Sequence, residues 1–312
     1  MRLVTRSDFD GLICAVLLKQ VEQIDSIQFV HPKDLQDGKF TVTAEDVLTN
    51  VPFVPGCGLW FDHHATEIER VVGKADFRGD CRLAPSAARV VYDYYGGADC
   101  FPGIEAMMAE VDKADAAQFS RDEILNPTGW PLLSFIMDAR TGLGRFKDYR
   151  ISNYQLMYEL IDACREMSIE EILRLPDVQQ RAERYFEQDV LFREMVAEHT
   201  RTEGRVVITD LRDVDPIYSG NRFLIYALYP EQNTSIWIVD GFRGQNCVFA
   251  CGQSILNPTA TTHIGNLMRR HGGGGHAAAG TCQVAHADAP ATLRDLVSTM
   301  NAVDHAGLAL AA

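Results

Sequence analysis

Three consecutive residues of metal-ligand type, Asp62, His63 and His64, follow the apolar run Gly58–Phe61. Such a run predicts a buried strand, and a strand that ends at the protein surface presents the next side chains around one point. Carboxylate oxygen and imidazole nitrogen together suit manganese, zinc or iron. We therefore interpret the triplet as part of a metal centre. The alternative is a polar turn in which one histidine is satisfied in the core.

A second acidic cluster lies near the N-terminus. Residues 1–5 read as a strand and residues 12–18 as a buried helix, with Asp8, Asp10 and Gly11 between them. Asp8 and Asp10 are two residues apart, so they point the same way in an extended segment. Gly11 permits a tight turn, and the start of the helix offers free amides to an anion. The alternative is an Asx-type turn with an acidic helix start.

Four consecutive glycines, Gly272–Gly275, lie between two arginines and His276. Such a run costs backbone entropy that a simple turn does not require. Its amides can approach phosphate oxygens, while a histidine and an arginine add donors and charge. We therefore predict an anion-binding loop, and the alternative is a flexible linker. The predicted substrate-binding residues are Gly273, Gly274, Gly275, His276 and Arg270.

These motifs together resemble those of a known family. Asp8-x-Asp10-Gly11, then Asp62-His63-His64, then Gly272–Gly280 follow the order found in the DHH phosphoesterase superfamily with its DHH-associated C-terminal domain. That superfamily includes RecJ-type exonucleases, nanoRNases that also dephosphorylate phosphoadenosine phosphate, cyclic-dinucleotide phosphodiesterases and exopolyphosphatases. The resemblance spans almost the whole chain. It implies an α/β fold with an N-terminal parallel-sheet catalytic domain and a smaller C-terminal α/β domain, with the active site in the cleft.

The order of elements agrees with more than one domain. At 312 residues the chain exceeds the usual size of a single core. Strand-like and helix-like segments alternate in the first half, which indicates parallel βαβ units with a site at the strand ends. We predict strands at 26–30, 40–45, 206–208, 223–228, 235–239 and 247–250, and helices at 86–95, 154–167, 177–199 and 263–270. The predicted division is 1–153 (catalytic domain), 154–200 (helical connector) and 201–312 (substrate-binding domain).

The resemblance also implies a ligand set for two metal ions. Asp8 would hold one ion and Asp10 the other. Asp46 would bridge both ions, and its alternative role is a helix cap at the surface. His63 and Asp115 would complete the second ion, with Asp112 as the alternative to Asp115. The remaining two residues of the triplet have catalytic roles: Asp62 would orient His63, and His64 would contact the phosphoryl oxygens.

One departure from the family pattern concerns the first ion. Many members have a histidine a few residues before the first aspartate, as a ligand of that ion. Residues 4–7 of this chain are Val, Thr, Arg and Ser, so the histidine is missing. The first ion must then be held less securely or be completed by another group. His31 is one candidate, with an ordinary loop histidine as the alternative.

The charge distribution limits the class of substrate. The net charge is −14, and residues 201–312 carry 8 Lys and Arg against 9 Asp and Glu. A protein that grips long nucleic acid usually has a basic stripe, and none is visible here. We therefore expect a small phosphorylated substrate or short single-stranded nucleic acid, and not duplex DNA. A membrane is not an expected partner, because no apolar run reaches spanning length. The helical connector could pair two chains in a homodimer.

The eight cysteines are scattered, without a Cys-x-x-Cys pair, and the N-terminus leads directly into a motif-bearing strand. This pattern favours a cytoplasmic protein with reduced thiols.

The resemblance implies a metal-dependent phosphoesterase that hydrolyses short oligonucleotides or phosphoadenosine phosphate. Two Mn²⁺ ions about 3.5–4 Å apart would activate water and neutralise the developing charge, with Mg²⁺ or Co²⁺ as alternative ions. An exopolyphosphatase is the first alternative, although its polyanionic substrate would favour a positive channel. A catalytically weakened sensor of nucleotide phosphates is the second alternative, and the missing histidine is its support.

Overall fold

The computed structural model describes residues 1–309 of the chain. Its residues form two compact units. The first unit comprises residues 1–119 and 127–184, and the second comprises residues 120–126 and the chain from Tyr185 onward. Helices of residues 154–184, which the sequence assigned to the connector, therefore pack within the first unit.

The first unit is built on a parallel sheet of five short strands. The strands are β1 (Arg2–Thr5), β2 (Ser26–Phe29), β3 (Asp46–Thr49), β4 (Leu59–Asp62) and β5 (Gly79–Cys81). Their spatial order is β2-β1-β3-β4-β5, and each neighbouring pair is parallel. The chain thus goes from β1 to one side and returns to the other side, so the strand order reverses at β1. Parallel sheets of this kind open a crevice outside the carboxyl ends of the strands at such a point.

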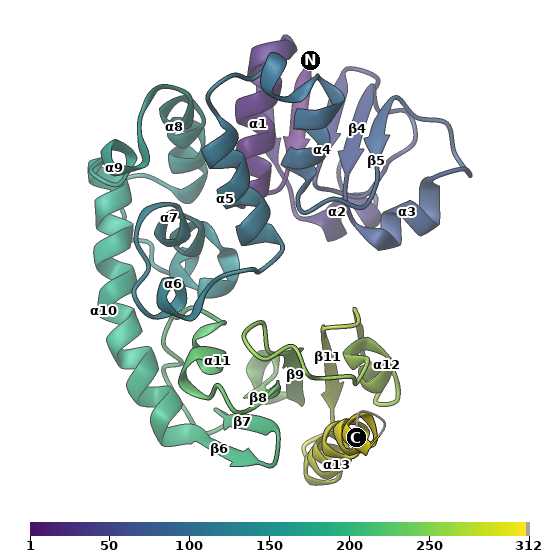
Figure 1. Ribbon diagram of the computed structural model, residues 1–312, viewed down its shortest axis with the longest axis vertical. Helices are drawn as coiled ribbons and strands as arrows, with labels where there is room; N and C mark the ends of the chain where they lie inside the picture. Colours follow the sequence, from purple (N-terminus) through teal and green to yellow (C-terminus); the bar gives the residue numbers. More distant parts are fainter. Residues whose placement is uncertain (310–312) are drawn as a thin grey trace. The chain divides into compact units, whose positions relative to one another are not determined.

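Apolar side chains on both faces of this sheet form the core. Leu3, Val47, Leu48 and Trp60 are fully buried, and burying each such side chain contributes roughly 1.5–3 kcal/mol. Helix α1 packs against α4, α5 and α8 (Figure 1). The helices of this unit are α1 (Phe9–Val21), α2 (Pro32–Gln36), α3 (Ala65–Val71), α4 (Ala87–Tyr94), α5 (Glu105–Asp115), α7 (Gly129–Met137), α8 (Asn153–Glu166), α9 (Ile169–Ile172) and the first part of α10 (Pro176–His199).

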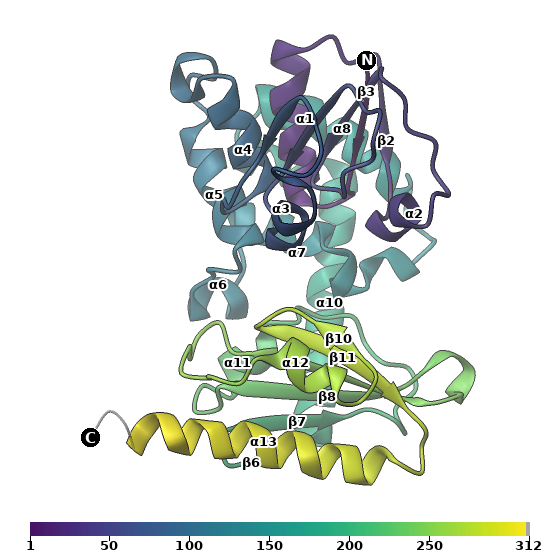
Figure 2. The same ribbon diagram turned by 90° about the vertical axis from the view of Figure 1, so that its right-hand side faces the viewer.

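The second unit contains a six-stranded mixed sheet in the order β10-β11-β9-β8-β7-β6. Its strands are β6 (Thr200–Glu203), β7 (Val206–Asp210), β8 (Thr234–Asp240), β9 (Cys247–Gln253), β10 (Gly274–Gly275) and β11 (Ala279–Val284), and its helices include α6 (Arg121–Leu125), α11 (Leu224–Leu228), α12 (Ile264–Arg269) and α13 (Ala289–Ala309). Ile236 and Ile238 of β8 face a core shared with α12 and α13, which cover one face of the sheet (Figure 2). Trp237 points to the other face, where it stacks on Phe192 of α10.

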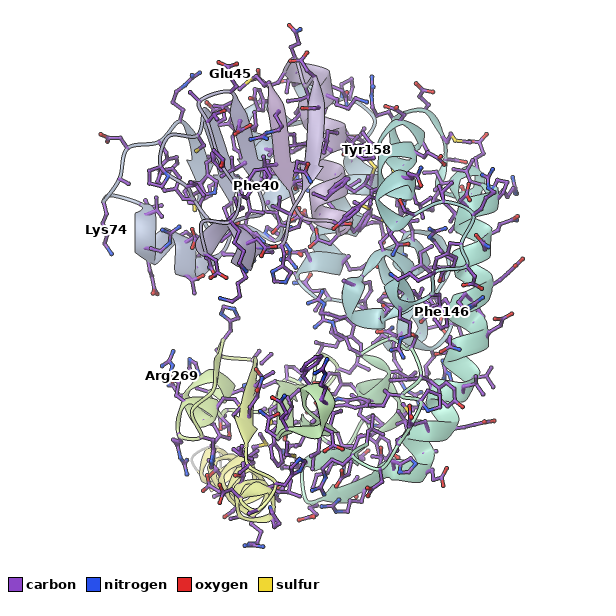
Figure 3. All side chains as sticks on the ribbon, turned by 180° about the vertical axis from the view of Figure 1, so that it is seen from behind. Phe40, Glu45, Lys74, Phe146, Tyr158 and Arg269 are labelled. Atoms are coloured by element: carbon purple, nitrogen blue, oxygen red, sulfur yellow. The ribbon has the colours of Figure 1, made fainter. Side chains whose placement is uncertain are left out.

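Two predicted strands are wrong. Residues 40–45 are not a strand, and the strand of this region is β3, which begins at Asp46. Phe40 and Glu45 lie in the loop that precedes it (Figure 3). Residues 224–228 form the helix α11 instead of a strand. A short apolar run fits a buried helix turn as well as a strand, because periodicity cannot distinguish the two over so few residues.

Each of the eight cysteines is a free thiol, and most of them are buried. Among residues 1–309, none of the helices combines the length and the apolar character that a membrane crossing needs.

Candidate metal centre

The predicted ligands of the first unit lie where strands β1 and β4 end. Asp8 follows β1 and caps α1, and Asp10 lies in the first turn of that helix. Asp62 is the last residue of β4, so His63 begins the loop that follows. Asp115 is the last residue of α5, a helix that packs against α1 and α4. Two strand ends and one helix end therefore bring these residues to the carboxyl edge of the sheet.

His63 has the tautomer and the environment of a metal ligand. Its Nδ1 lies 3.1 Å from the backbone oxygen of Ala84, to which it donates a hydrogen bond. The lone pair of Nε2 is then directed at two carboxylates, 3.2 Å from Asp115 Oδ2 and 3.9 Å from Asp10 Oδ2. This nitrogen is buried without a hydrogen-bond partner in the described part of the chain. A backbone carbonyl on one ring nitrogen commonly orients the other toward a metal.

Asp10, His63 and Asp115 form a group whose ligand atoms lie within 4.8 Å of one another. Asp10 is only 2% exposed, and its two oxygens accept hydrogen bonds from the amides of Ala87 and Ala88 at the start of α4. Burial and the nearby charge of Asp8 raise the pKa of Asp10 to about 7 despite these bonds. A divalent cation would offset this unfavourable free energy of ionisation, because it stabilises the ionised carboxylates. The donor set therefore fits a metal ion.

Asp112, the alternative to Asp115, has other partners. Its carboxylate accepts hydrogen bonds from Ser86 Oγ at 2.7 Å and from the guanidinium of Arg89 at 2.6 and 2.8 Å. It therefore anchors the start of α4 to α5. The structure brings Asp115 into the cluster, with 26% of its side chain exposed, and leaves Asp112 outside it.

Asp62 and His64 form a pair of their own. Asp62 is fully buried, and its Oδ1 lies 2.8 Å from His64 Nδ1 and accepts a hydrogen bond from the His63 amide. Burial opposes the charged form of His64, but Asp62 outweighs it and raises the pKa of this imidazole above its usual value. The predicted role of Asp62 needs correction: its ring partner is His64, while the carbonyl of Ala84 orients the ring of His63.

The prediction for Asp46 is wrong. Asp46 begins β3 and lies in register with Arg2 at the start of β1, so it occupies the edge of the sheet opposite to the cluster. Its carboxylate accepts hydrogen bonds from Arg2 at 2.7 and 2.8 Å and from the Thr43 amide at 2.7 Å. The error comes from the strand that was placed at residues 40–45, which would have put Asp46 at a carboxyl end.

Residue Asn50 takes the position where that carboxylate was expected. It directly follows β3, and its Nδ2 donates a hydrogen bond to Asp8 Oδ1 at 3.2 Å. Sequence reasoning missed Asn50 and also the α4 amides that bind Asp10. The signal for Asn50 was available, because a polar residue comes directly after the run Val47–Thr49.

The glycine run serves close packing in the second unit. A Cβ atom on Gly273 would lie 2.0 Å from the Thr281 oxygen, and one on Gly275 would lie 2.3 Å from the Ala279 oxygen. The amide of Gly273 donates to the Met268 oxygen at 3.0 Å. Its predicted role as an anion donor is therefore corrected, while Gly274 and Gly275 form β10.

The two predicted polar side chains around this loop, Arg270 and His276, differ in their contacts. Arg270 pairs with Asp295 of α13 at 2.8 Å and remains exposed, so its role as a substrate ligand stays a prediction. His276 follows β10 and is exposed, and its amide donates to the Ala279 oxygen at 2.7 Å. Both predicted polar side chains of the loop are exposed, but Arg270 is held by an ion pair with Asp295, whereas no side-chain partner is seen for His276 in the described part of the chain.

Comparisons with known proteins show the family to which the chain belongs. No protein-family model and no curated protein matches the chain. Among solved structures, the pGpG-specific phosphodiesterase PggH from Vibrio cholerae is 53% identical to the chain, with a TM-score of 0.85, and the match covers 96% of this chain and 99% of that one. The DHH domain of a member of a ribosomal protein family is 12% identical, with a TM-score of 0.56 and coverage of 96% and 86%, a likeness of fold.

The match to PggH extends over both units, and the Asp-x-Asp and Asp-His-His motifs meet at one edge of a parallel sheet. The chain belongs to the DHH phosphoesterase superfamily and is a phosphoric ester hydrolase.

Proposed function

We propose that this protein hydrolyses pGpG, the linear dinucleotide of guanosine with a 5′-phosphate. Water would attack the internal phosphodiester, the bond to the 3′ oxygen would break, and two molecules of GMP would form. The observation that carries the proposal is the 53% identity to a pGpG-specific phosphodiesterase over 96% of the chain. The net charge of −14 also suits a short substrate better than a long polyanion, which would favour a basic surface.

The metal that we propose is Mn²⁺, held by Asp10, His63 and Asp115. When bound, it would supply Lewis-acid activation of the phosphodiester and of water. Two carboxylates with one imidazole favour Mn²⁺ over Mg²⁺, which prefers oxygen ligands alone. The chain's own contribution is to hold the three ligands in place, through the amides of α4 on Asp10 and the Ala84 carbonyl on His63.

His64 is the proposed donor to a phosphoryl oxygen. Its Nδ1 is held by Asp62, which leaves Nε2 to donate to the substrate. The raised pKa of His64 keeps more of the imidazole in its charged form near neutral pH. A charge-assisted hydrogen bond of this kind stabilises the negative charge that develops on the phosphoryl group.

A cavity of about 670 Å³ in the first unit gives room for a nucleoside. Its lining includes Ser7, next to Asp8, and the side chains of Lys147 and Tyr149. The Tyr149 ring packs on the Arg181 guanidinium, with 4.2 Å between the guanidinium carbon and the ring centroid. Its hydroxyl is buried without a hydrogen-bond partner in the described part of the chain. We propose that this hydroxyl, which is shielded from solvent in the unliganded protein, bonds to the nucleoside when the cavity lining rearranges on binding.

The Tyr149→Phe variant tests this role. It removes only the hydroxyl, so we expect KM for pGpG to rise about fivefold, the effect of one hydrogen bond near 1 kcal/mol, with kcat unchanged. Stability should not fall, since the hydroxyl has no partner to lose in the unliganded protein. Steady-state kinetics and thermal unfolding check both points. Tyr94→Phe, at an exposed tyrosine of α4, is the matched control, and an unchanged KM for Tyr149→Phe would contradict the assignment.

His276 is the proposed contact to the part of the substrate farthest from the cleaved bond. We expect His276→Ala to raise KM for pGpG about tenfold, as for the loss of one charge-assisted hydrogen bond. KM for a small chromogenic phosphodiester should change much less, because that compound lacks the distal part. His286→Ala is the control, since His286 is an exposed histidine of the same unit that bonds to the Gly244 oxygen. Equal effects on the two substrates would exclude this role for His276.

The direct test of the proposed function is product release from a panel of substrates with Mn²⁺. The panel contains pGpG, other dinucleotides, RNA of three to five nucleotides, phosphoadenosine phosphate, cyclic dinucleotides and polyphosphate. We expect GMP from pGpG at a kcat/KM well above that of every other compound. Preferential turnover of polyphosphate would select an exopolyphosphatase, and binding of pGpG without turnover would select a sensor.

A further inference from the structure

The carboxylate of Asp8 is already paired with a fixed positive charge. Arg6 Nε lies 3.0 Å from Asp8 Oδ2. The other oxygen, Oδ1, accepts hydrogen bonds from the Gly11 amide at 2.9 Å and from Asn50 Nδ2 at 3.2 Å. Both oxygens therefore have donors, and one donor is a cation. These are the surroundings of a carboxylate that binds a guanidinium.

A second metal ion beside Asp8 would find no group of three carboxylate, imidazole or thiolate ligands that includes Asp8 among the described side chains. The residue after β3 is Asn50, whose amide nitrogen faces Asp8, and Asp46 lies at the opposite edge of the sheet. His31 caps α2, with its Nδ1 accepting a hydrogen bond from the Lys33 amide. Among the side chains that the structure describes, those of residues 1–302, two groups could hold an ion, and both include His63 whereas neither includes Asp8. The residues around Asp8 therefore do not fit the first ion of the family pattern.

The side chain of Arg6 is placed to act on the substrate. It is 32% exposed, and an ion pair through Nε leaves the terminal nitrogens of a guanidinium for a second anion. A guanidinium stays charged at all relevant pH values and binds phosphate oxygens through parallel hydrogen bonds. A divalent ion on Asp8 would lie beside this positive charge and be repelled by it.

We infer that this protein binds one divalent ion, at Asp10, His63 and Asp115, and that the Arg6 guanidinium, held by Asp8, takes the place of a second ion at the phosphoryl group. The inference rests on the proposed phosphodiesterase function. Asp8 is then a positioning residue for Arg6 and not a metal ligand. The expected two-ion centre becomes a centre of one ion and one arginine.

Metal content gives a test that does not depend on turnover. We expect equilibrium dialysis with Mn²⁺, followed by elemental analysis, to give one ion per chain. Its electron paramagnetic resonance spectrum should be that of an isolated Mn²⁺ and not of an exchange-coupled pair. Asp8→Asn should keep the ion, since asparagine retains the cap on the Gly11 amide, whereas Asp10→Asn should lose it. Two coupled ions in the wild-type protein, or loss of the ion in Asp8→Asn, would overturn the inference.

Variants of Arg6 test its role at the phosphoryl group. Arg6→Ala should keep one ion and lower kcat about 100-fold, the usual effect of removing one preorganised donor. Arg6→Lys should recover part of the rate because it keeps the charge. Arg165→Ala is the control, since Arg165 lies on α8 and faces Asp162 at 3.8 Å. A wild-type kcat in Arg6→Ala would show that the guanidinium takes no part.

The double variant Arg6→His with Asn50→Asp is designed to restore a site for the second metal ion. It replaces the cation by an imidazole and the amide by a carboxylate, so we expect two Mn²⁺ ions per chain. A single ion in this variant would contradict the view that Arg6 and Asn50 exclude the second one. Because ion counts are measured without substrate, one ion in a protein that does not cleave pGpG would refute the proposed substrate and leave this inference standing.

Discussion

Replacement of His63 by alanine is expected to remove Mn²⁺ binding and to lower kcat/KM for the phosphodiester substrate by a factor on the order of 1000 or more. The reason is geometric: the ring is locked by the Ala84 carbonyl, and its Nε2 is the neutral ligand between the carboxylates of Asp10 and Asp115. Without it, two acidic groups remain that repel one another. Calorimetric titration with Mn²⁺ and steady-state kinetics measure both effects.

The matched control for this prediction is His31→Ala. His31 is an exposed histidine of the same unit whose ring caps α2, so its loss should leave metal binding and turnover unchanged. Far-UV circular dichroism separates loss of the ligand from loss of the fold. A His63→Ala variant that folds and still binds Mn²⁺ with wild-type affinity would contradict the proposed ligand set.

The residues at strand ends could be predicted because a buried strand is easy to recognise. Leu3 and Val4, like Trp60 and Phe61, are buried apolar residues directly before a polar motif. The carboxyl ends of parallel strands meet at one edge of a sheet, so two such motifs must come close together. This reasoning needed no information from distant parts of the chain, and it located the aspartates of α1 and the Asp62-His63-His64 loop.

The residues that sequence reasoning misplaced depend on pairing between distant segments. Thr41 and Val42 favour a strand by composition, but the buried run that pairs with β1 begins at Asp46. Because the predicted strand was placed a few residues too early, the prediction put Asp46 at the metal site, whereas it lies at the opposite edge of the sheet. The proposed role of Arg6 could not be predicted from the sequence either. It depends on Asp8, whose carboxylate contacts both Arg6 and the distant residue Asn50.

Asp46 is expected to support the fold and not the reaction. Asp46→Asn removes the charge that Arg2 binds through two hydrogen bonds, so the free energy of unfolding should fall by about 2 kcal/mol, the range for hydrogen bonds to a charged group. Arg2 is partly exposed and can be rehydrated, which keeps the loss below that of a fully buried pair. Urea unfolding measures the loss, and kcat and Mn²⁺ stoichiometry of the folded variant should equal those of the wild type.

The pH dependence of this difference identifies its cause. Burial opposes ionisation of Asp46, but Arg2 and Thr43 outweigh it and hold the pKa of this carboxyl below its usual value of 3.8. A group with a lowered pKa contributes stability above its unfolded pKa and loses it as the pH falls through the folded pKa. The difference between wild type and Asp46→Asn should therefore be constant above about pH 5 and shrink below about pH 4. A variant with normal stability and no activity would instead return Asp46 to the metal centre, against the position that β3 gives it.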